Sequence, residues 1–304
     1  MATPAADEQA RKGVFEARVL SSCPICREHF RLRLGVDDFP QAEPGQFVQI
    51  LCSAPDGGGC SGGPLLRRPF SIGGMRRNGR QIELEIVYRV VGAGTRWLSN
   101  LSEGNRVSVL GPQGRPFMLD SDRPLALLVG GGVGLPPIVW LAESVARTGG
   151  QAVAFCGARS ADLLPLAVHP SVVAADGEPS LSIEEFARHG IAACLTTDDG
   201  TLGLGGRIPE ALERYLDSHR GAASRAAAYT CGPEPMIRAV ARACESRGIP
   251  CQVCLERLMA CGMGTCQSCV IRTHDADDPE GWVYRLCCTD GPVFDSRQVV
   301  WASA

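Results

Sequence analysis

The sequence predicts a chain of three parts: an antiparallel β-barrel, a doubly wound α/β domain and a small cysteine-rich C-terminal domain. Its 304 residues suffice for two or three domains, because domains usually have about 100–200 residues. Short β-like runs fill the first third, strands alternate with helical patterns after Pro124, and cysteines gather after residue 250. The predicted parts are a polar tail over residues 1–12 and domains over 13–117, 118–250 and 251–304.

The first domain is predicted to be a barrel because its apolar runs are short and turn residues separate them. Several short strands at this spacing are typical of a small antiparallel barrel. The expected strands span residues 14–20, 30–34, 47–52, 70–72, 82–87 and 106–110. The glycine-rich stretch 56–63 between two of these strands is expected to be an exposed loop.

In the second domain, continuous apolar strands alternate with helical patterns. This alternation indicates a parallel sheet covered by helices on both faces. The expected strands span residues 125–129, 151–156, 191–196 and 227–231, and the expected helices span 137–147, 182–188, 209–218 and 235–247. The chain after residue 250 is expected to be mostly loop.

Composition narrows the classes of function. Thirty basic against 33 acidic residues give a net charge of −3, which predicts no basic field for nucleic acid and no polybasic patch for a membrane. The longest uncharged stretch, 125–142, is interrupted by Gly130 to Gly132, Gly134 and two prolines. A strand, a turn and a helix explain it better than a membrane span.

The fifteen cysteines are the unusual feature of the composition. A disulfide scaffold would be short and would carry a signal peptide, whereas the first residues here are polar. We therefore expect the protein to lie in the reducing cytoplasm. Cys261, Cys266 and Cys269 have C-x4-C-x2-C spacing, and Cys287-Cys288 follow. This is the plant-type spacing of a [2Fe–2S] cluster, with a zinc site or inert cysteines as alternatives.

Four further motifs are candidates for binding a nucleotide cofactor. The glycine-rich turn Gly130-Gly131-Gly132-Val133-Gly134 leads from a strand into a helix. Such a turn either binds a pyrophosphate or is a tight strand–helix connection without a ligand. Arg67-Arg68-Pro69-Phe70-Ser71 suits either a flavin cradle or an edge strand. Gly92-Ala93-Gly94-Thr95 predicts a helix start with Thr95 as its N-cap. Cys231, at a strand end before Gly232-Pro233, suits a cofactor-facing or a core thiol.

Together and in this order, these motifs resemble the ferredoxin–NADP reductase superfamily. Within it, the chain is similar to the electron-transfer subunits of class 1B dihydroorotate dehydrogenases, which serve pyrimidine biosynthesis. The residues that carry this resemblance are 255–266 (LERLMACGMGTC) and 288–294 (CTDGPVF), with 43–48, 88–92 and 197–200 in support. The resemblance covers roughly residues 14–300.

The resemblance implies an oxidoreductase component with FAD, NAD and [2Fe–2S] domains, and a heterotetramer with a separate FMN-containing catalytic subunit. Electrons would pass from FMN through the cluster and FAD to NAD⁺, since a flavin exchanges both single electrons and hydrides. The implied FAD residues are Arg68, Pro69, Phe70, Ser71, Gly94 and Thr95, and the implied NAD residues are Gly130, Gly131, Gly132 and Gly134. Cys231 is the implied catalytic residue beside the nicotinamide, and Cys261, Cys266, Cys269 and Cys288 are the implied cluster ligands.

Three departures from the family pattern keep other interpretations open. The Cys23/Cys26 and Cys251/Cys254 pairs could jointly bind zinc or act as a redox pair, as in a non-catalytic sensing module. Cys60 in the 56–63 loop has no assigned role. Arg159 follows the second strand, where NAD enzymes often place an acidic residue. Arg159 could accept a 2′-phosphate, which supports the alternative of a small flavin and iron–sulfur subunit of an NADH-dependent ferredoxin:NADP⁺ oxidoreductase or a sulfide dehydrogenase.

Overall fold

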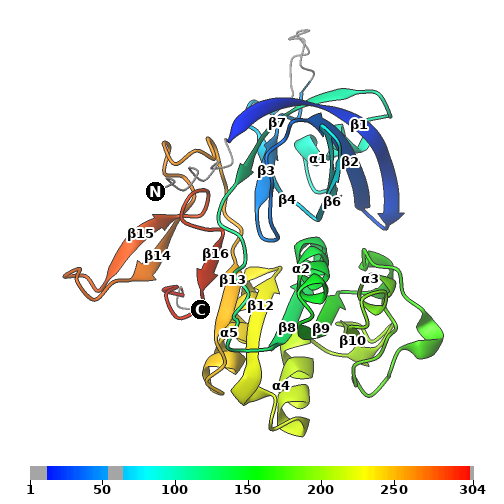
Figure 1. The fold of residues 1–304 in the computed structure, drawn as a ribbon, viewed down its shortest axis with the longest axis vertical. Helices are drawn as coiled ribbons and strands as arrows, with labels where there is room; N and C mark the ends of the chain where they lie inside the picture. The colour runs from blue at the N-terminus through cyan, green and yellow to red at the C-terminus, as the bar shows by residue number, and fades with distance from the viewer. Residues whose placement is uncertain (1–11, 54–63, 302–304) are drawn as a thin grey trace, which may run out of the picture.

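The computed structural model describes residues 12–53 and 64–301. Two seven-stranded sheets and a two-stranded hairpin make up its β-structure (Figure 1). The predicted tail before Lys12 and the predicted 56–63 loop with Cys60 lie outside the described residues. No helix of the described residues is long and apolar enough to span a membrane.

The first sheet is antiparallel and curls around its own core, as the sequence predicted (Figure 1). Its strand order is β4-β3-β7-β1-β2-β6-β5. The elements are β1 (Gly13–Cys26), β2 (His29–Asp37), β3 (Phe47–Ile50), β4 (Arg68–Ser71), β5 (Gly74–Asn78), β6 (Gln81–Arg89), α1 (Ala93–Ser99) and β7 (Arg106–Gln113). Inward residues of β6 such as Ile82, Leu84 and Ile86 are fully buried, and the polar residues between them are not, as a sheet with one wet face requires.

Two of these strands differ from the prediction. β1 continues to Cys26 because two irregularities in its register with β2 let the strand bend around the barrel. β5 was not predicted, because Arg76, Arg77 and Asn78 lie exposed on an edge strand. Such an edge presents polar side chains on both faces and has no apolar alternation to detect.

The second sheet has the order β11-β10-β9-β8-β12-β13-β16 and is parallel except between β13 and β16. Its strands are β8 (Leu125–Gly131), β9 (Gln151–Ala158), β10 (Ala192–Thr197), β11 (Leu204–Gly205), β12 (Ala226–Cys231), β13 (Cys251–Cys254) and β16 (Val293–Asp295). Its helices are α2 (Leu135–Arg147), α3 (Glu184–Ala187), α4 (Ile208–Ser218) and α5 (Glu234–Glu245), with short 3-10 turns η1 (Gly132–Gly134), η2 (Ala161–Leu163), η3 (Pro170–Val172) and η4 (Ala223–Arg225).

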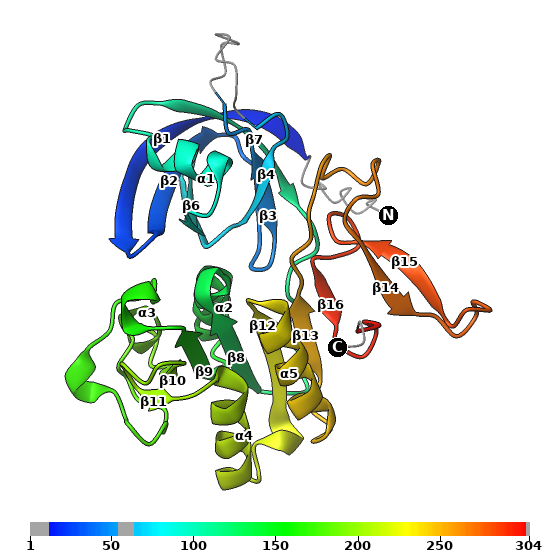
Figure 2. The same cartoon turned by 180° about the vertical axis from the view of Figure 1, so that it is seen from behind.

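Helices cover both faces of this sheet, so the predicted doubly wound arrangement is confirmed (Figure 2). Alternate residues of β8 show why. Leu127 packs in a core with residues of α4 and α5, whereas Leu128 packs in a core with residues of α2 and α3. A strand buried on both faces has no polar positions, which explains the continuous apolar run in the sequence.

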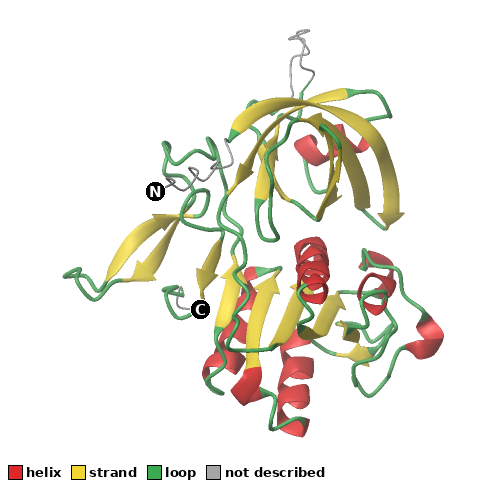
Figure 3. Ribbon diagram, viewed as in Figure 1, coloured by secondary structure: helices red, strands yellow, loops and turns green. Residues whose placement is uncertain are grey.

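The C-terminal segment is built onto the second sheet. β13 pairs with β12, and β16 returns to pair with β13. Between them, β14 (Val270–His274) and β15 (Trp282–Leu286) form a hairpin that projects from the body (Figure 3). The expectation of a mostly loop-like segment was wrong for this hairpin, where Arg272 stacks over the Trp282 ring at 4.2 Å.

The curled sheet and the α/β part pack against each other through α2. Trp140 of α2 is buried in the barrel's core cluster. Pro136, in the first turn of α2, lies so close to Gly73 that a side chain there would come within 2.9 Å of it. The carboxyl ends of β8, β12 and β13 therefore face the barrel (Figure 1).

Candidate functional site

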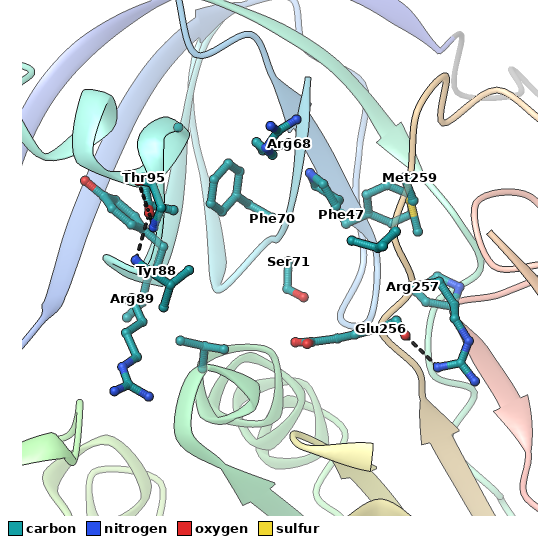
Figure 4. A pocket seen from close by; sticks show the side chains of 18 of the residues that line it. Phe47, Arg68, Phe70, Ser71, Tyr88, Arg89, Thr95, Glu256, Arg257 and Met259 are labelled. Carbon is teal, nitrogen blue, oxygen red and sulfur yellow. Dashed lines mark hydrogen bonds between the residues drawn. The ribbon is translucent and has the colours of Figure 1, made fainter. Parts of the chain in front are cut away.

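A cavity of about 730 Å³ lies where the barrel, the α/β part and the C-terminal segment meet (Figure 4). Most of the lining surface is apolar, as in a cofactor pocket with a few polar groups that fix orientation. Predicted site residues that line it are Arg68, Pro69, Phe70, Ser71, Gly94, Thr95 and Cys231. Residues from three motifs that are far apart in the sequence therefore line the same cavity.

The barrel wall comes from β4 and β6. Phe70 of β4 stacks edge-on against Tyr88 of β6 with ring centroids 5.8 Å apart. Arg68 lines the cavity, whereas the neighbouring Arg67 turns away and donates to the backbone oxygen and the hydroxyl of Ser108, each at 2.8 Å. Arg67 therefore holds strands together, and Arg68 is the arginine available to a ligand.

The turn before α1 forms a second part of this wall. The prediction that Thr95 is the N-cap was wrong: Gly92 is the N-cap, and Thr95 is the third residue of the helix. The Thr95 hydroxyl accepts hydrogen bonds from the backbone N–H groups of Val91 and Gly92, at 2.9 and 3.1 Å. Its role in the structure is to shape the loop that faces the cavity.

The α/β wall is made where the ends of three strands meet. Cys231 ends β12, beside Gly130 of β8 on one side and Cys254 of β13 on the other. Val133 lines the cavity, whereas the four predicted glycines Gly130, Gly131, Gly132 and Gly134 are not among its lining residues. Their glycine character is needed at Gly134, where a Cβ would overlap the carbonyl of Cys231 and come within 2.5 Å of the Gly232 nitrogen.

The third wall was not predicted as part of a cofactor pocket. It is the segment Cys254 to Met259, which leaves β13 and leads into the cysteine motif. Glu256 points into the cavity toward Ser71, whereas Arg257 points out and binds Glu234 at 2.7 Å (Figure 4). Partial removal from water raises the pKa of the Glu256 carboxyl above its ordinary value of 4.5.

The cysteine motif forms a tight loop directly after this wall. The backbone N–H groups of Met263 and Cys266 donate to the Cys261 sulfur at 3.3 and 3.4 Å. Gly262 and Gly264 have φ of +68° and +88°, a conformation that suits glycine. Hydrogen bonds from the Ser268 hydroxyl and nearby backbone groups lower the pKa of Cys266 to about 6, so a thiolate forms there readily.

Comparison with known proteins bears directly on this arrangement. A family model described as the iron-sulfur cluster binding domain of dihydroorotate dehydrogenase B matches residues 256–300. A protein of Desulforamulus reducens named "Dihydroorotate dehydrogenase B (NAD(+)), electron transfer subunit" is 32% identical over 95% of this chain and 98% of its own. A protein of Geobacillus thermodenitrificans with the same name is 36% identical over 85% and 87%.

The chain belongs to the electron transfer subunits of dihydroorotate dehydrogenase B. It is thus a component of an oxidoreductase, as the resemblance in the sequence implied. These relatives support that interpretation over the alternative of a ferredoxin:NADP⁺ oxidoreductase or sulfide dehydrogenase subunit.

Solved structures add the fold of this electron transfer subunit. The structure of an NADH-dependent reduced ferredoxin-NADP oxidoreductase covers 94% of this chain and 90% of its own, with a TM-score of 0.73 and 24% identity. A ferredoxin reductase of carbazole 1,9a-dioxygenase covers 80% and 68%, with a TM-score of 0.61 and 20% identity. At these identities the likeness establishes the reductase-like fold.

The four cysteines predicted as ligands in this electron transfer subunit lie as two pairs. Cys261 and Cys266 are joined by the hydrogen bonds of the loop, and the Cys288 thiol is hydrogen-bonded to that of Cys269. Among residues 12–53 and 64–301, no three Cys, His, Asp or Glu side chains gather as a single metal ion would require. Two pairs suit a cluster of two irons, each held by two thiolates.

Other cysteines of the electron transfer subunit pair elsewhere. Cys23 and Cys26 lie in the first sheet and Cys251 and Cys254 in the second, so in the described part of the chain these two pairs do not form a joint zinc site. Cys254 instead hydrogen-bonds to Cys231, and this contact and burial raise the pKa of Cys231 well above its ordinary value. Cys231 therefore faces the cavity as a neutral thiol.

Proposed function

We propose that this electron transfer subunit carries electrons from an FMN-containing dihydroorotate dehydrogenase subunit to NAD⁺, with FAD and a [2Fe–2S] cluster as its carriers. One observation carries the proposal: the segment Leu255 to Met259 is at once a wall of the cavity and the approach to Cys261. A flavin in the cavity and a cluster in the loop would thus be neighbours, as electron transfer requires.

We assign the cavity to FAD. Its volume of about 730 Å³ and its apolar lining suit a flavin ring with a polar tail. Arg68 would neutralise phosphate charge, Phe70 and Ser71 would border the ring, and the turn at Gly94 and Thr95 would receive the phosphates. When bound, FAD supplies hydride exchange toward a nicotinamide and single-electron exchange toward a cluster.

We assign the α/β strand ends to NAD. The turn Gly130 to Gly134 precedes α2, whose N-terminal end favours a pyrophosphate. Cys231 would contact the nicotinamide as a neutral thiol and would add no negative charge at the place of hydride transfer. Two charged residues lie at the strand ends where the ribose of the dinucleotide would bind. Arg159 is exposed after β9, and Asp198 follows β10, where its backbone N–H donates to the Ala158 carbonyl. We propose NAD over NADP because the relatives are named NAD(+) subunits.

We assign Cys261, Cys266, Cys269 and Cys288 to the [2Fe–2S] cluster. The C-x4-C-x2-C spacing, the two thiol pairs and the N–H groups that point at the Cys261 sulfur all suit it. Burial raises the pKa of Cys288 to about 11, and iron binding would displace that proton.

We propose that the partner docks over the cluster loop, in a heterotetramer. Leu258 and Met263, on either side of Cys261, are 89% and 62% exposed, and a partner docked over the loop would cover both apolar side chains. A cytoplasmic location is proposed with it, since the fourteen described cysteines are all unpaired by disulfides and a reducing compartment keeps them so.

The deciding experiment is cofactor analysis of protein purified without oxygen, followed by a visible-spectrum titration with NADH and with NADPH. We expect one FAD and two irons per chain and bleaching of both chromophores by NADH. A preference for NADPH would overturn the NAD assignment. A folded protein without flavin or iron would overturn the electron-transfer proposal itself.

A further inference from the structure

Two buried glutamines lie between the cavity and the cysteine loop. Gln49 of β3 is 0% exposed and Gln113 of β7 is 1% exposed. The side-chain oxygen of each has no hydrogen-bond partner among the described residues. Burying an amide with an unpaired oxygen costs stability, so such a pair calls for a reason beyond packing.

Both glutamines lie directly against Gly262 of the cysteine loop. A Cβ at Gly262 would lie 2.6 Å from the Gln49 Cδ and 2.9 Å from the Gln113 Oε1, and closest of all to the Gln49 Nε2. The φ of Gly262 is +68°. A side chain at this position would have to displace both amides, so glycine lets the loop lie directly against them.

The same glutamines also border the proposed flavin site. Gln49 Nε2 lies 3.9 Å from the sulfur of Met259, which lines the cavity two residues before Cys261. Phe47, which points to the same side of β3 as Gln49, lines the cavity and pairs with Gln113 across the strands. Figure 4 shows Phe47 and Met259 together at this side of the cavity.

We propose that Gln49 and Gln113 are positioning residues that hold Gly262 and set the potential of the cluster relative to the flavin. Gln49 presents amide N–H groups toward a loop whose sulfurs carry negative charge in the proposed cluster. Donors near cluster sulfurs stabilise the more negative reduced form and so raise the reduction potential. This inference rests on the proposed cluster, and it concerns residues outside its ligand set.

The first test is an EPR-monitored redox titration of Gln49→Leu and Gln113→Leu. The matched control is Val48→Thr, because Val48 is buried on the same strand but packs in the barrel core. We expect Gln49→Leu to shift the cluster's reduction equilibrium about tenfold toward the oxidised form, which is about 59 mV for one electron. Gln113→Leu removes an amide oxygen that faces the loop, and not a donor, so it should shift the equilibrium toward the reduced form, and the control should leave it unchanged. Wild-type potentials in both iron-loaded leucine variants would overturn the inference.

A second test measures iron content, and it decides the proposal if the leucine variants bind no cluster and cannot be titrated. Gly262→Ala should lose iron, because its Cβ would overlap the Gln49 amide. Adding Gln49→Ala should restore part of the iron, whereas equal loss with either residue at position 49 would overturn the contact. If the wild-type protein holds no iron, the proposed function fails. In that case hydrogen exchange of residues 259–264 tests the contact alone: exchange no faster in Gln49→Leu than in wild type would overturn it.

Discussion

Cys287 and Cys288 are adjacent and both fully buried, but their thiols have different neighbours. The Cys288 thiol lies against Cys269 and the Gly264 N–H, whereas Cys287 has Arg257, Cys269 and Cys254 as neighbours, and its burial raises its pKa to about 12. In the proposed assignment, Cys288 is the fourth cluster ligand and Cys287 is a core thiol.

We therefore predict that Cys288→Ser loses most of its iron and that Cys287→Ser, its matched control, keeps it. Anaerobic iron and sulfide analysis of both proteins measures this directly. Iron loss from Cys287→Ser with retention in Cys288→Ser would reverse the assignment of the fourth ligand.

Glu256 makes a pH-dependent contribution to the stability of the flavin-free protein. Its folded pKa is raised, so the folded state favours the protonated carboxyl more than the unfolded state does. Its contribution is thus present at acidic pH and is lost as the pH rises through the folded pKa. We predict that Glu256→Gln matches wild type in urea unfolding at about pH 4, below the ordinary pKa of 4.5, and is more stable at about pH 8. A difference that does not change between these conditions would contradict the prediction.

At the scale of elements, the turns after β8 and β12 pack directly on each other. Gly134 has an ordinary φ of −79°, so the glycine is needed for close approach and not for backbone freedom. Gly132 is the converse case, because its φ is +55° and a Cβ there would meet nothing within 4 Å.

We predict that Gly134→Ala destabilises the protein by about 3 kcal/mol through overpacking and weakens NADH binding. Gly132→Ala should cost only about 1–2 kcal/mol, the backbone strain of a left-handed residue. Urea unfolding and NADH titration of both variants make the comparison. Equal costs would mean that the two turns can move apart.

The elements differ in how clearly the sequence predicted them. The four predicted α/β strands are buried apolar runs, and β8, β9, β10 and β12 confirm them in that chain order at approximately the predicted bounds. The shorter strands β11, β13 and β16 of the same sheet were not predicted. β14 and β15 were missed because the hairpin projects from the body and exposes residues such as Tyr284 and Arg285. A strand that buries little leaves little pattern in its residues.

At the scale of the whole molecule, the cysteine loop is the outer end of the proposed electron path. We predict that Cys261→Ser keeps NADH–dye reduction, which needs only the cavity, and abolishes electron flow to the partner. Both activities are measured on the same flavin-loaded preparation. Joint loss of both activities in a protein that still holds FAD would contradict this order of carriers.

Assembly with the catalytic subunit also concerns the whole molecule, and the exposed apolar side chains beside the cysteine loop are its proposed contact. We predict that Leu258→Asp weakens association with the catalytic subunit at least about tenfold, as expected for a central interface residue. Val172→Asp is the control, because Val172 is also an exposed apolar residue, at 48%, but lies on η3, in the part of the α/β domain built around β9 and β10. Calorimetric titration with the partner measures both, and equal effects would place the interface elsewhere.

The sequence by itself predicted the family, the oxidoreductase class and the plan of a barrel, an α/β domain and an iron–sulfur segment. Cysteine spacing, glycine turns and the Arg-Pro-Phe-Ser run are local patterns, and local patterns survive without a fold. Only the tertiary structure decided which residues share the cavity. Glu256, Gln49 and Gln113 carry no motif of their own. They become neighbours of the site because strand pairing and the packing of the barrel on the α/β domain bring distant segments together, and that packing depends on the whole chain.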